Sequence, residues 1–146
     1  MADDRAATDS RAGPLELRVG IDLVSVRQIA ESLAAFGDRF LRRIFTEDEI
    51  AYATSEPSQT AERLAARFAA KEATIKALDL GRVGLGWRDI EVRRTASGRC
   101  ELALHGTVAA AAEAAGADRF ALSMSHEGEH ATAIVITHTR PKGPIS

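Results

Sequence analysis

The stretch ARFAAKEATIKAL, Ala66–Leu78, combines helical hydrophobic spacing with charges in an unusual place. At about 100° per residue, Phe68 and Ile75 share one arc of a helix. Lys71 falls within that arc and Glu72 lies just beside it. Two charges buried without partners would be strongly unfavourable. This helix therefore either presents an ordinary solvated charged face or lines a cleft that holds a polar ligand.

The pattern on either side of this helix predicts an alternation of strands and helices. Alternating apolar residues and turn residues indicate strands, and capping residues with helical spacing indicate helices. The expected elements are a strand over 15–24, a helix over 25–36 capped by Ser25, a short turn or helix over 40–45, a helix beginning with the capping box at 46–49 and broken at Pro57, a long helix over 58–78, a loop over 81–86, strands over 89–94 and 100–104, a helix over 105–116, and a hairpin of 120–126 with 129–137.

These elements predict one α+β domain in which an antiparallel sheet packs against the long helix. The 146 residues suffice for a single hydrophobic core. We assign the domain to residues 15–138. Residues 1–14 and 139–146 are expected to be disordered tails, since both are poor in apolar residues and contain proline and glycine.

Composition describes an ordinary globular protein and argues against several functions. Hydrophobic residues make up 45% of the chain, charged residues make up 27%, and the net charge is -2. Aromatic residues are scarce, at 5%, so stacking platforms for single-stranded bases are not expected. Cys100 is the only cysteine, no apolar run reaches the roughly 18 residues of a membrane span, and the N-terminus lacks the apolar core of a signal peptide. We expect a cytoplasmic protein without a nucleic-acid or membrane partner.

A carboxylate interrupts the first predicted strand. In GIDLV, Gly20–Val24, Asp22 follows residues that favour burial. Asp22 is either a strand-end residue that caps the next helix or a ligand of a hard cation. Mg²⁺ usually takes one or two protein carboxylates and fills its remaining positions with water and phosphate oxygens. Asp22 and Glu72 would be a sufficient pair.

The predicted hairpin carries Ser123-Met124-Ser125-His126 near its tip. Side chains alternate along a strand, so Ser123 and Ser125 share one face and His126 points to the other. A lone histidine at such a tip is either an exposed structural residue or part of a site. None of these features indicates a function by itself.

Together, three segments resemble the motifs of a known enzyme family. GIDLV (20–24), RFAAKEATIKA (67–77) and SMSHEGEHATAIVI (123–136) are similar, in the same order, to the three motifs of the holo-acyl-carrier-protein synthase group, the short-chain branch of the 4′-phosphopantetheinyl transferases. The central motif F-x-x-K-E-x-x-x-K is filled without a gap from Phe68 to Lys76. The W-x-D-I-E-V of residues 87–92 also matches the family.

The resemblance implies a fold, a reaction and a set of site residues. The fold is that of the 4′-phosphopantetheinyl transferases, with the active site at a subunit interface. Such enzymes transfer the 4′-phosphopantetheine arm of coenzyme A to a serine hydroxyl of an apo acyl carrier protein and release 3′,5′-ADP. By resemblance, Asp22 and Glu72 bind Mg²⁺, Lys76 neutralises the diphosphate, and Glu72 accepts the serine proton. The residues implied in catalysis are Asp22, Glu72, Lys76 and His126. The residues implied in coenzyme A binding are Arg67, Lys71, Lys76 and His126.

The resemblance also implies partners. Longer members of the superfamily carry two similar halves with the site between them, and a chain of this size resembles one half. A homotrimer is therefore expected. The carrier protein is expected to be acidic, and Arg39, Arg42 and Arg43 form the densest basic cluster in the chain, which is either a docking surface or a solvated turn. Gln28 stands where many relatives have arginine.

Two other functions remain open at the level of sequence. A non-catalytic module that binds coenzyme A or a carrier protein would share the same fold. A metal-dependent phosphohydrolase would share the carboxylates and lysines but would need no acceptor protein. Transfer of the arm to an apo carrier protein distinguishes the predicted enzyme from both.

Overall fold

The computed structural model describes residues 14–140 and has the predicted α+β architecture with antiparallel sheets. The tails predicted at 1–14 and 139–146 lie outside the described residues except at their inner ends. At the C-terminal side, the last strand continues to Thr139, where it pairs with Glu16.

The helices and strands follow the predicted order. Their bounds are β1 Glu16–Ser25, α1 Val26–Phe36, α2 Asp38–Ile44, α3 Glu47–Thr54, a 3₁₀ turn Pro57–Gln59, α4 Thr60–Leu78, a second 3₁₀ turn Trp87–Asp89, β2 Ile90–Arg94, β3 Cys100–Leu104, α5 Gly106–Ala114, β4 Phe120–Glu127 and β5 His130–Thr139. The first strand ends at Ser25, one residue beyond the predicted 15–24, and the long helix begins at Thr60 after the short turn that Pro57 opens.

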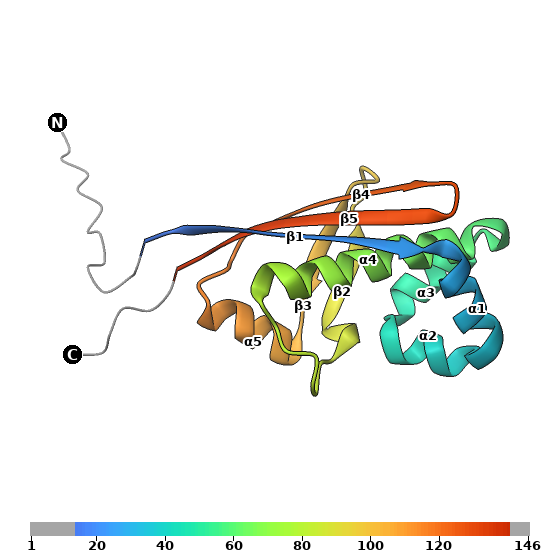
Figure 1. Ribbon diagram of the computed structural model, residues 1–146, viewed down its shortest axis with the longest axis horizontal. Helices are drawn as coiled ribbons and strands as arrows, with labels where there is room; N and C mark the ends of the chain where they lie inside the picture. Colours follow the sequence, from blue (N-terminus) through green and yellow to red (C-terminus); the bar gives the residue numbers. More distant parts are fainter. Residues whose placement is uncertain (1–13, 141–146) are drawn as a thin grey trace.

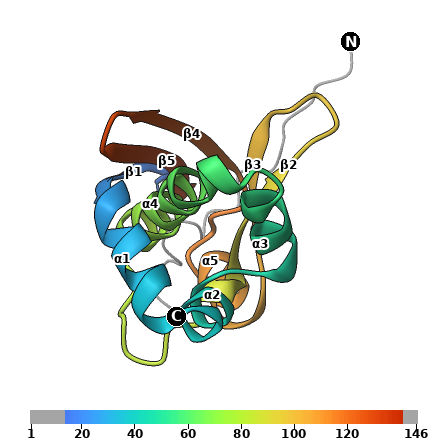
Figure 2. The same ribbon diagram turned by 90° about the vertical axis from the view of Figure 1, so that its right-hand side faces the viewer.

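The strands form two sheets. A three-stranded antiparallel sheet has the order β1-β5-β4, and β2 pairs with β3 in a separate hairpin. Helix α4 runs along one face of the larger sheet, with α1, α2 and α3 gathered at one end and α5 at the other (Figure 1). Viewed along its axis, α4 lies between the larger sheet and the remaining elements (Figure 2). The long helix is therefore buried on more than one side.

Small residues allow the sheet to approach α4 closely. A Cβ atom added at Gly20 would lie 1.9 Å from the carbonyl oxygen of Ala73 and 2.8 Å from the backbone nitrogen of Ala77. Only glycine fits β1 at this crossing. Ala70 and Ala73 are fully buried on the helix. The alanine-rich sequence of α4 thus sets the short distance between helix and sheet.

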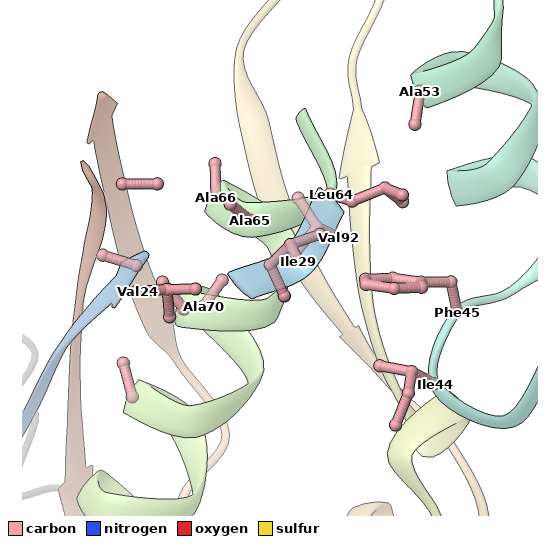
Figure 3. Close-up of a cluster of buried hydrophobic side chains, with 14 of the residues drawn as sticks. Val24, Ile29, Ile44, Phe45, Ala53, Leu64, Ala65, Ala66, Ala70 and Val92 are labelled. Atoms are coloured by element: carbon pink, nitrogen blue, oxygen red, sulfur yellow. The ribbon is translucent and has the colours of Figure 1, made fainter. Parts of the chain in front are cut away.

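The main core joins α4 to both layers. Figure 3 shows small side chains of α4, among them Ala66 and Ala70, beside Val24 of β1, and the ring of Phe45 on the other side of the cluster. Phe45 and Leu64 have no exposed surface. Burying side chains of this size contributes roughly 1.5–3 kcal/mol each.

Local capping signals fix the ends of the helices. The Ser25 hydroxyl accepts a hydrogen bond from the Gln28 N–H, and Thr46 and Glu49 form a reciprocal capping box, as predicted. Helix α4 ends at Leu78, and its C-cap residue Asp79 has a left-handed φ of 54°.

Within residues 14–140, no helix is both long and apolar enough to cross a membrane.

One face of the larger sheet is apolar and exposed. Gly20, Asp22 and Val24 of β1 point toward α4, so the alternate residues of the strand point outward. Their exposed fractions are 59–76%, and Ile136 of the adjacent strand continues the patch. The outward apolar face comprises Leu15, Leu17, Val19, Ile21, Leu23 and Ile136. Such a contiguous patch is typical of an interaction surface.

Candidate active site

Helix α4 carries the three charged residues of the central motif, and Arg67 just before it, on two different sides. Arg67 and Lys71 are one turn apart, as are Glu72 and Lys76. At about 100° per residue, the second pair lies on the side of the helix roughly opposite the first. The two pairs also contact different parts of the protein. Glu72 and Lys76 contact the loop after α4 and strand β1, whereas Arg67 and Lys71 contact residues of α3.

Glu72 and Lys76 lie on the side that faces the β1 edge of the sheet. The Lys76 ammonium donates hydrogen bonds to the Ile21 carbonyl oxygen at 2.9 Å and to Asp22 Oδ1 at 3.0 Å. Asp22 has a side chain that is 20% exposed, and Glu72 has one that is 7% exposed. The structure thus brings Asp22 to Lys76, one turn along the helix from Glu72.

Arg82 completes this cluster, and sequence reasoning missed it. Its Nη1 donates a hydrogen bond to Glu72 Oε1 at 3.0 Å, and its Nη2 contacts Glu72 Oε2. Arg82 lies in the glycine-containing loop after α4, in a segment for which no site residue was predicted. We call Asp22, Glu72, Lys76 and Arg82 the carboxylate cluster. Each of its two carboxylates has one cationic partner.

The donor atoms of the carboxylate cluster fit a hard divalent cation. Asp22 and Glu72 offer carboxylate oxygens from two rigid elements, β1 and α4. Mg²⁺ is commonly held by one or two protein carboxylates, with water and phosphate oxygens in the other positions. Among residues 14–140, no three or more His, Cys, Asp or Glu side chains form a group that could hold a metal ion. Two carboxylates with a phosphate-bearing ligand match this arrangement.

Lys71 is turned into the protein interior. Its side chain has no exposed surface, and its ammonium donates to Glu49 Oε1 at 2.8 Å, to the Trp87 carbonyl oxygen at 3.1 Å and to the Ile90 carbonyl oxygen. Burial lowers the pKa of Lys71, and the neighbouring Glu49 carboxylate opposes that effect. With these partners in place, this geometry does not support a direct contact between Lys71 and a nucleotide.

Arg67 lies beside Tyr52 in a cluster of arginines. The guanidinium carbons of Arg63, Arg67 and Arg94 lie 4.4, 4.3 and 4.7 Å from the centre of the Tyr52 ring. We call these three residues the arginine cluster. Arg67 is only 4% exposed, burial lowers its pKa, and its Nε has no hydrogen-bond partner among the described residues. Its Nη1 donates to the Arg63 carbonyl oxygen at 3.4 Å. The positive charge gathered by these arginines is suited to an anion.

His126 shares a hollow with Arg67. This hollow has a volume of about 190 Å³ and is also lined by Arg63 and Tyr52. The His126 side chain is 57% exposed, and its Nδ1 lies 3.8 Å from Glu62 Oε2. Ser123 and Ser125 are exposed, in agreement with the predicted alternation along the hairpin. The structure therefore brings His126 and Arg67 together.

The two groups of site residues lie at opposite edges of the sheet. Asp22 on β1 pairs with Ala133 on β5, and Ala133 pairs in turn with Met124 on β4. His126 belongs to β4, the strand at the far edge. Within one chain, the carboxylate cluster and the hollow beside Arg67 are thus on different sides of α4.

Two of the three arginines that were predicted to form either a docking surface or a solvated turn line a groove. The groove, of about 490 Å³, has Arg39 and Arg43 with Phe36 along its wall. Phe36 is 62% exposed. Arg42 does not line the groove and lies 3.9 Å from Glu47. This combination of apolar surface and arginine fits an acidic helix with an apolar stripe.

Comparison with known proteins identifies similar chains. The sequence model described as the 4′-phosphopantetheinyl transferase superfamily matches residues 18–135. A holo-[acyl-carrier-protein] synthase of Koribacter versatilis is 49% identical over 121 residues, which cover 82% of this chain and 96% of that protein. One from Solibacter usitatus is 44% identical over 118 residues, which cover 80% and 94%. The ACPS-CoA complex of Chronobacterium ammoniagenes matches with a TM-score of 0.75 and 35% identity, covering 84% of this chain and 97% of that one.

Proposed function

The chain belongs to the 4′-phosphopantetheinyl transferase superfamily, and from this premise we propose that it is a holo-[acyl-carrier-protein] synthase. It transfers the 4′-phosphopantetheine group of coenzyme A to a serine hydroxyl of an apo acyl carrier protein and releases 3′,5′-ADP. The observation that carries this proposal is the meeting of Asp22 with Lys76, one helical turn from the nearly buried Glu72. Relatives that carry the names of this enzyme and of its complex with coenzyme A support it.

Asp22 and Glu72 are the residues that would hold Mg²⁺. The metal would supply charge neutralisation for the diphosphate of coenzyme A. Lys76 already contacts Asp22, so it is placed to donate to a diphosphate oxygen beside the same carboxylates. Phosphoryl transfer depends on such positioning and charge balance more than on a protein nucleophile.

Glu72 is the proposed proton acceptor. The serine oxygen of the carrier protein forms a bond to the phosphorus of the phosphopantetheine arm as the bond to 3′,5′-ADP breaks, and the serine proton passes to a base. Glu72 is nearly buried on a rigid helix, so its carboxylate is held in one position. His126 is proposed to act near the bound coenzyme A from the other side of the site.

The nucleotide end of coenzyme A is proposed to bind at the hollow beside Arg67. Arg67 and the neighbouring Arg63 line this hollow and provide positive charge for a phosphate. Lys71 acts there indirectly in our proposal. Its buried contacts with Glu49 and two carbonyl oxygens hold α4 against α3 and β2, and thereby orient Arg67 one turn away.

A complete site is proposed to need two copies of the chain. Within one copy, Asp22 and His126 lie on opposite edge strands of the sheet. If copies associate head to tail, the carboxylate cluster of one meets the Arg67 hollow of the next. Heterologous contacts of this kind close into rings. The outward apolar face of the sheet supports such an association, and the family resemblance sets the proposed number of copies at three.

The groove beside α2 is the proposed docking site for the carrier protein. Arg39 and Arg43 would pair with acidic residues, and Phe36 would pack against an apolar stripe. We expect Arg39→Glu and Arg43→Glu to raise the KM for the carrier protein with little change in kcat. Arg42→Glu is the matched control, since Arg42 belongs to the same helix but does not line the groove. Equal effects of all three variants would reject this docking site.

The lone cysteine, Cys100, is unpaired and suits a reducing compartment, so we propose a cytoplasmic location.

Magnesium dependence is also part of the proposal. Its direct check is loss of transfer on chelation and recovery on adding Mg²⁺.

The test of the proposed function is mass spectrometry of an apo acyl carrier protein incubated with coenzyme A and Mg²⁺. The carrier serine should gain the phosphopantetheine mass, and 3′,5′-ADP should appear in equal amount. Glu72→Gln should abolish the gain while circular dichroism stays unchanged. Near-normal transfer by Glu72→Gln would show that the carboxylate assignment is wrong.

The two other functions give different outcomes in the same assay. A phosphohydrolase would release 3′,5′-ADP without an acceptor, and a non-catalytic binding module would modify no carrier protein. Several apo carrier proteins should be tested, because an active enzyme would give no product with a carrier protein that it does not recognise.

A further inference from the structure

Glu72 has a counter-ion that comes from a surface loop. Both Glu72 oxygens face the two terminal nitrogens of Arg82, at 3.0 Å for the Oε1 contact. The Glu72 side chain is 7% exposed, whereas that of Arg82 is 60% exposed. A nearly buried carboxylate is thus neutralised by a side chain that solvent reaches freely.

Leu80 and Leu85 pack the two ends of the loop that carries Arg82 against a hydrophobic cluster, but the middle of the loop is free of such contacts. A Cβ atom added at Gly81 or Gly84 would meet nothing within 4 Å, and Val83 is fully exposed. Gly84 has a φ of 72°, which glycine adopts readily. By contrast, Lys76, the partner of Asp22, has its backbone in helix α4, and its side chain is 50% exposed. Of these two cations, Arg82 is the one whose backbone can also move without disturbing a helix.

The contact between Arg82 and Glu72 opposes the binding of a metal ion to Glu72. A guanidinium bound through two nitrogens uses one lone pair of each carboxylate oxygen. A divalent cation at the remaining lone pairs would lie beside a like charge. Arg82 therefore weakens metal binding at Glu72 for as long as it stays in this position.

We propose that Arg82 is the displaceable counter-ion of Glu72, which holds this carboxylate in the metal-free protein and leaves it when a divalent cation binds. This inference rests on the proposed assignment of Glu72 as a metal ligand. Arg82 also lines a hollow of about 340 Å³ with Arg43 and Arg88. When coenzyme A is bound as well, its diphosphate would offer Arg82 a new negatively charged partner.

The test is a titration with Mn²⁺ in the absence of coenzyme A, with free Mn²⁺ measured by electron paramagnetic resonance. In Arg82→Gln the metal no longer has to displace a cation, so the affinity for Mn²⁺ should rise by roughly tenfold, the order of effect that one adjacent cation has on a carboxylate. Arg88→Gln is the control, because it removes the same charge from the same hollow without touching Glu72. Its affinity for Mn²⁺ should stay near that of the wild type.

A second readout follows the loop itself. Hydrogen exchange of residues 80–86 should become faster in metal-free Glu72→Gln than in the wild-type protein, because Arg82 loses its charged partner. Exchange in α4 should not change. Unchanged exchange in the loop would contradict a holding role for the Arg82 contact.

The outcomes separate this inference from the proposed function. If Glu72→Gln loses Mn²⁺ binding while Arg82→Gln binds as the wild type does, Glu72 is a metal ligand and the displacement proposal is overturned. If Glu72→Gln binds Mn²⁺ normally, the metal assignment fails and the proposal fails with it. Tighter binding by Arg82→Gln alone supports the exchange of guanidinium for metal.

Discussion

Lys71 and Glu49 form an ion pair that solvent does not reach. Glu49 accepts hydrogen bonds from Lys71 at 2.8 Å, from the Thr46 N–H at 2.9 Å and from the Val92 N–H at 3.1 Å. One carboxylate therefore caps α3, pairs with α4 and binds the middle of β2. The desolvation of both charges is offset by these contacts only while all partners remain.

We expect Lys71→Met to lower the free energy of unfolding by about 3–5 kcal/mol, because it leaves the Glu49 carboxylate buried without its cation. Chemical denaturation with urea measures this loss. The double variant Lys71→Met/Glu49→Gln should regain part of it, since no unpaired charge is then buried. A single variant as stable as the wild type would contradict a structural role for Lys71.

Glu91 links protonation to stability. It accepts hydrogen bonds from Thr46 Oγ1 and Arg93 Nε, each at 2.8 Å, and its Oε1 lies 3.0 Å from His105 Nε2. Burial raises the pKa of Glu91, but the contacts with His105, Thr46 and Arg93 outweigh it and hold the pKa below the ordinary 4.5. A depressed carboxyl pKa adds stability that is present above the unfolded value and is lost as the pH falls through the folded value.

The difference in unfolding free energy between wild type and Glu91→Gln should therefore level off above pH 4.5 and shrink as the pH falls below 4.5. Urea denaturation at a series of pH values measures it. Glu113→Gln, which changes an exposed residue of α5, is the control and should show no such trend. A difference that grows on acidification would contradict the depressed pKa.

At the scale of elements, features that depend on neighbours in the sequence were predicted better than contacts between distant elements. The Ser25 cap, the Thr46 capping box and the hairpin near His126 depend on neighbours in sequence, and all three are present. The burial of Lys71 was not predictable in this way, because its partner Glu49 lies 22 residues away. Arg82 was missed since loop residues follow no periodic pattern that shows where they point.

Helical periodicity predicted that Lys71 and Glu72 lie at or beside the same apolar arc of α4, but in the structure they contact different partners. The apolar arc that contains Lys71 is indeed buried, and the required partner comes from α3. Glu72 faces the other way, toward Arg82. Sequence reasoning thus recognised that the charges needed partners, and only the tertiary contacts identify them.

The crossing of β1 over α4 makes Gly20 a sensitive position. Gly20→Ala places a methyl group 1.9 Å from the Ala73 carbonyl oxygen, so strand and helix must separate. We expect a loss of about 1–3 kcal/mol or more in unfolding free energy. Gly81→Ala, where the added methyl group meets nothing within 4 Å, is the control and should be nearly neutral. Equal stabilities in thermal denaturation would contradict close contact at this crossing.

For the whole molecule, the outward apolar face predicts self-association. Ile21 is 61% exposed at the centre of β1, and we expect Ile21→Lys to dissociate the proposed trimer because it places charges in an apolar contact. Sedimentation velocity measures the assembly. Val83→Lys makes the same chemical change at an exposed loop residue outside this face and should leave the assembly intact. Dissociation by both variants, or by neither, would reject this face as the contact.

If the site is shared between copies, two inactive variants should restore each other. Glu72→Gln damages the carboxylate cluster, and Arg67→Gln damages the hollow on the other side of α4. In mixed rings, some contacts join the intact carboxylate cluster of one copy to the intact hollow of the next. Random mixing makes about one contact in four intact, so about a quarter of wild-type transfer should return after the variants are unfolded and refolded together. A site built within one chain gives no recovery, because no chain in the mixture carries both intact halves. Each variant refolded alone is the control, and persistent inactivity of the mixture would overturn the shared site.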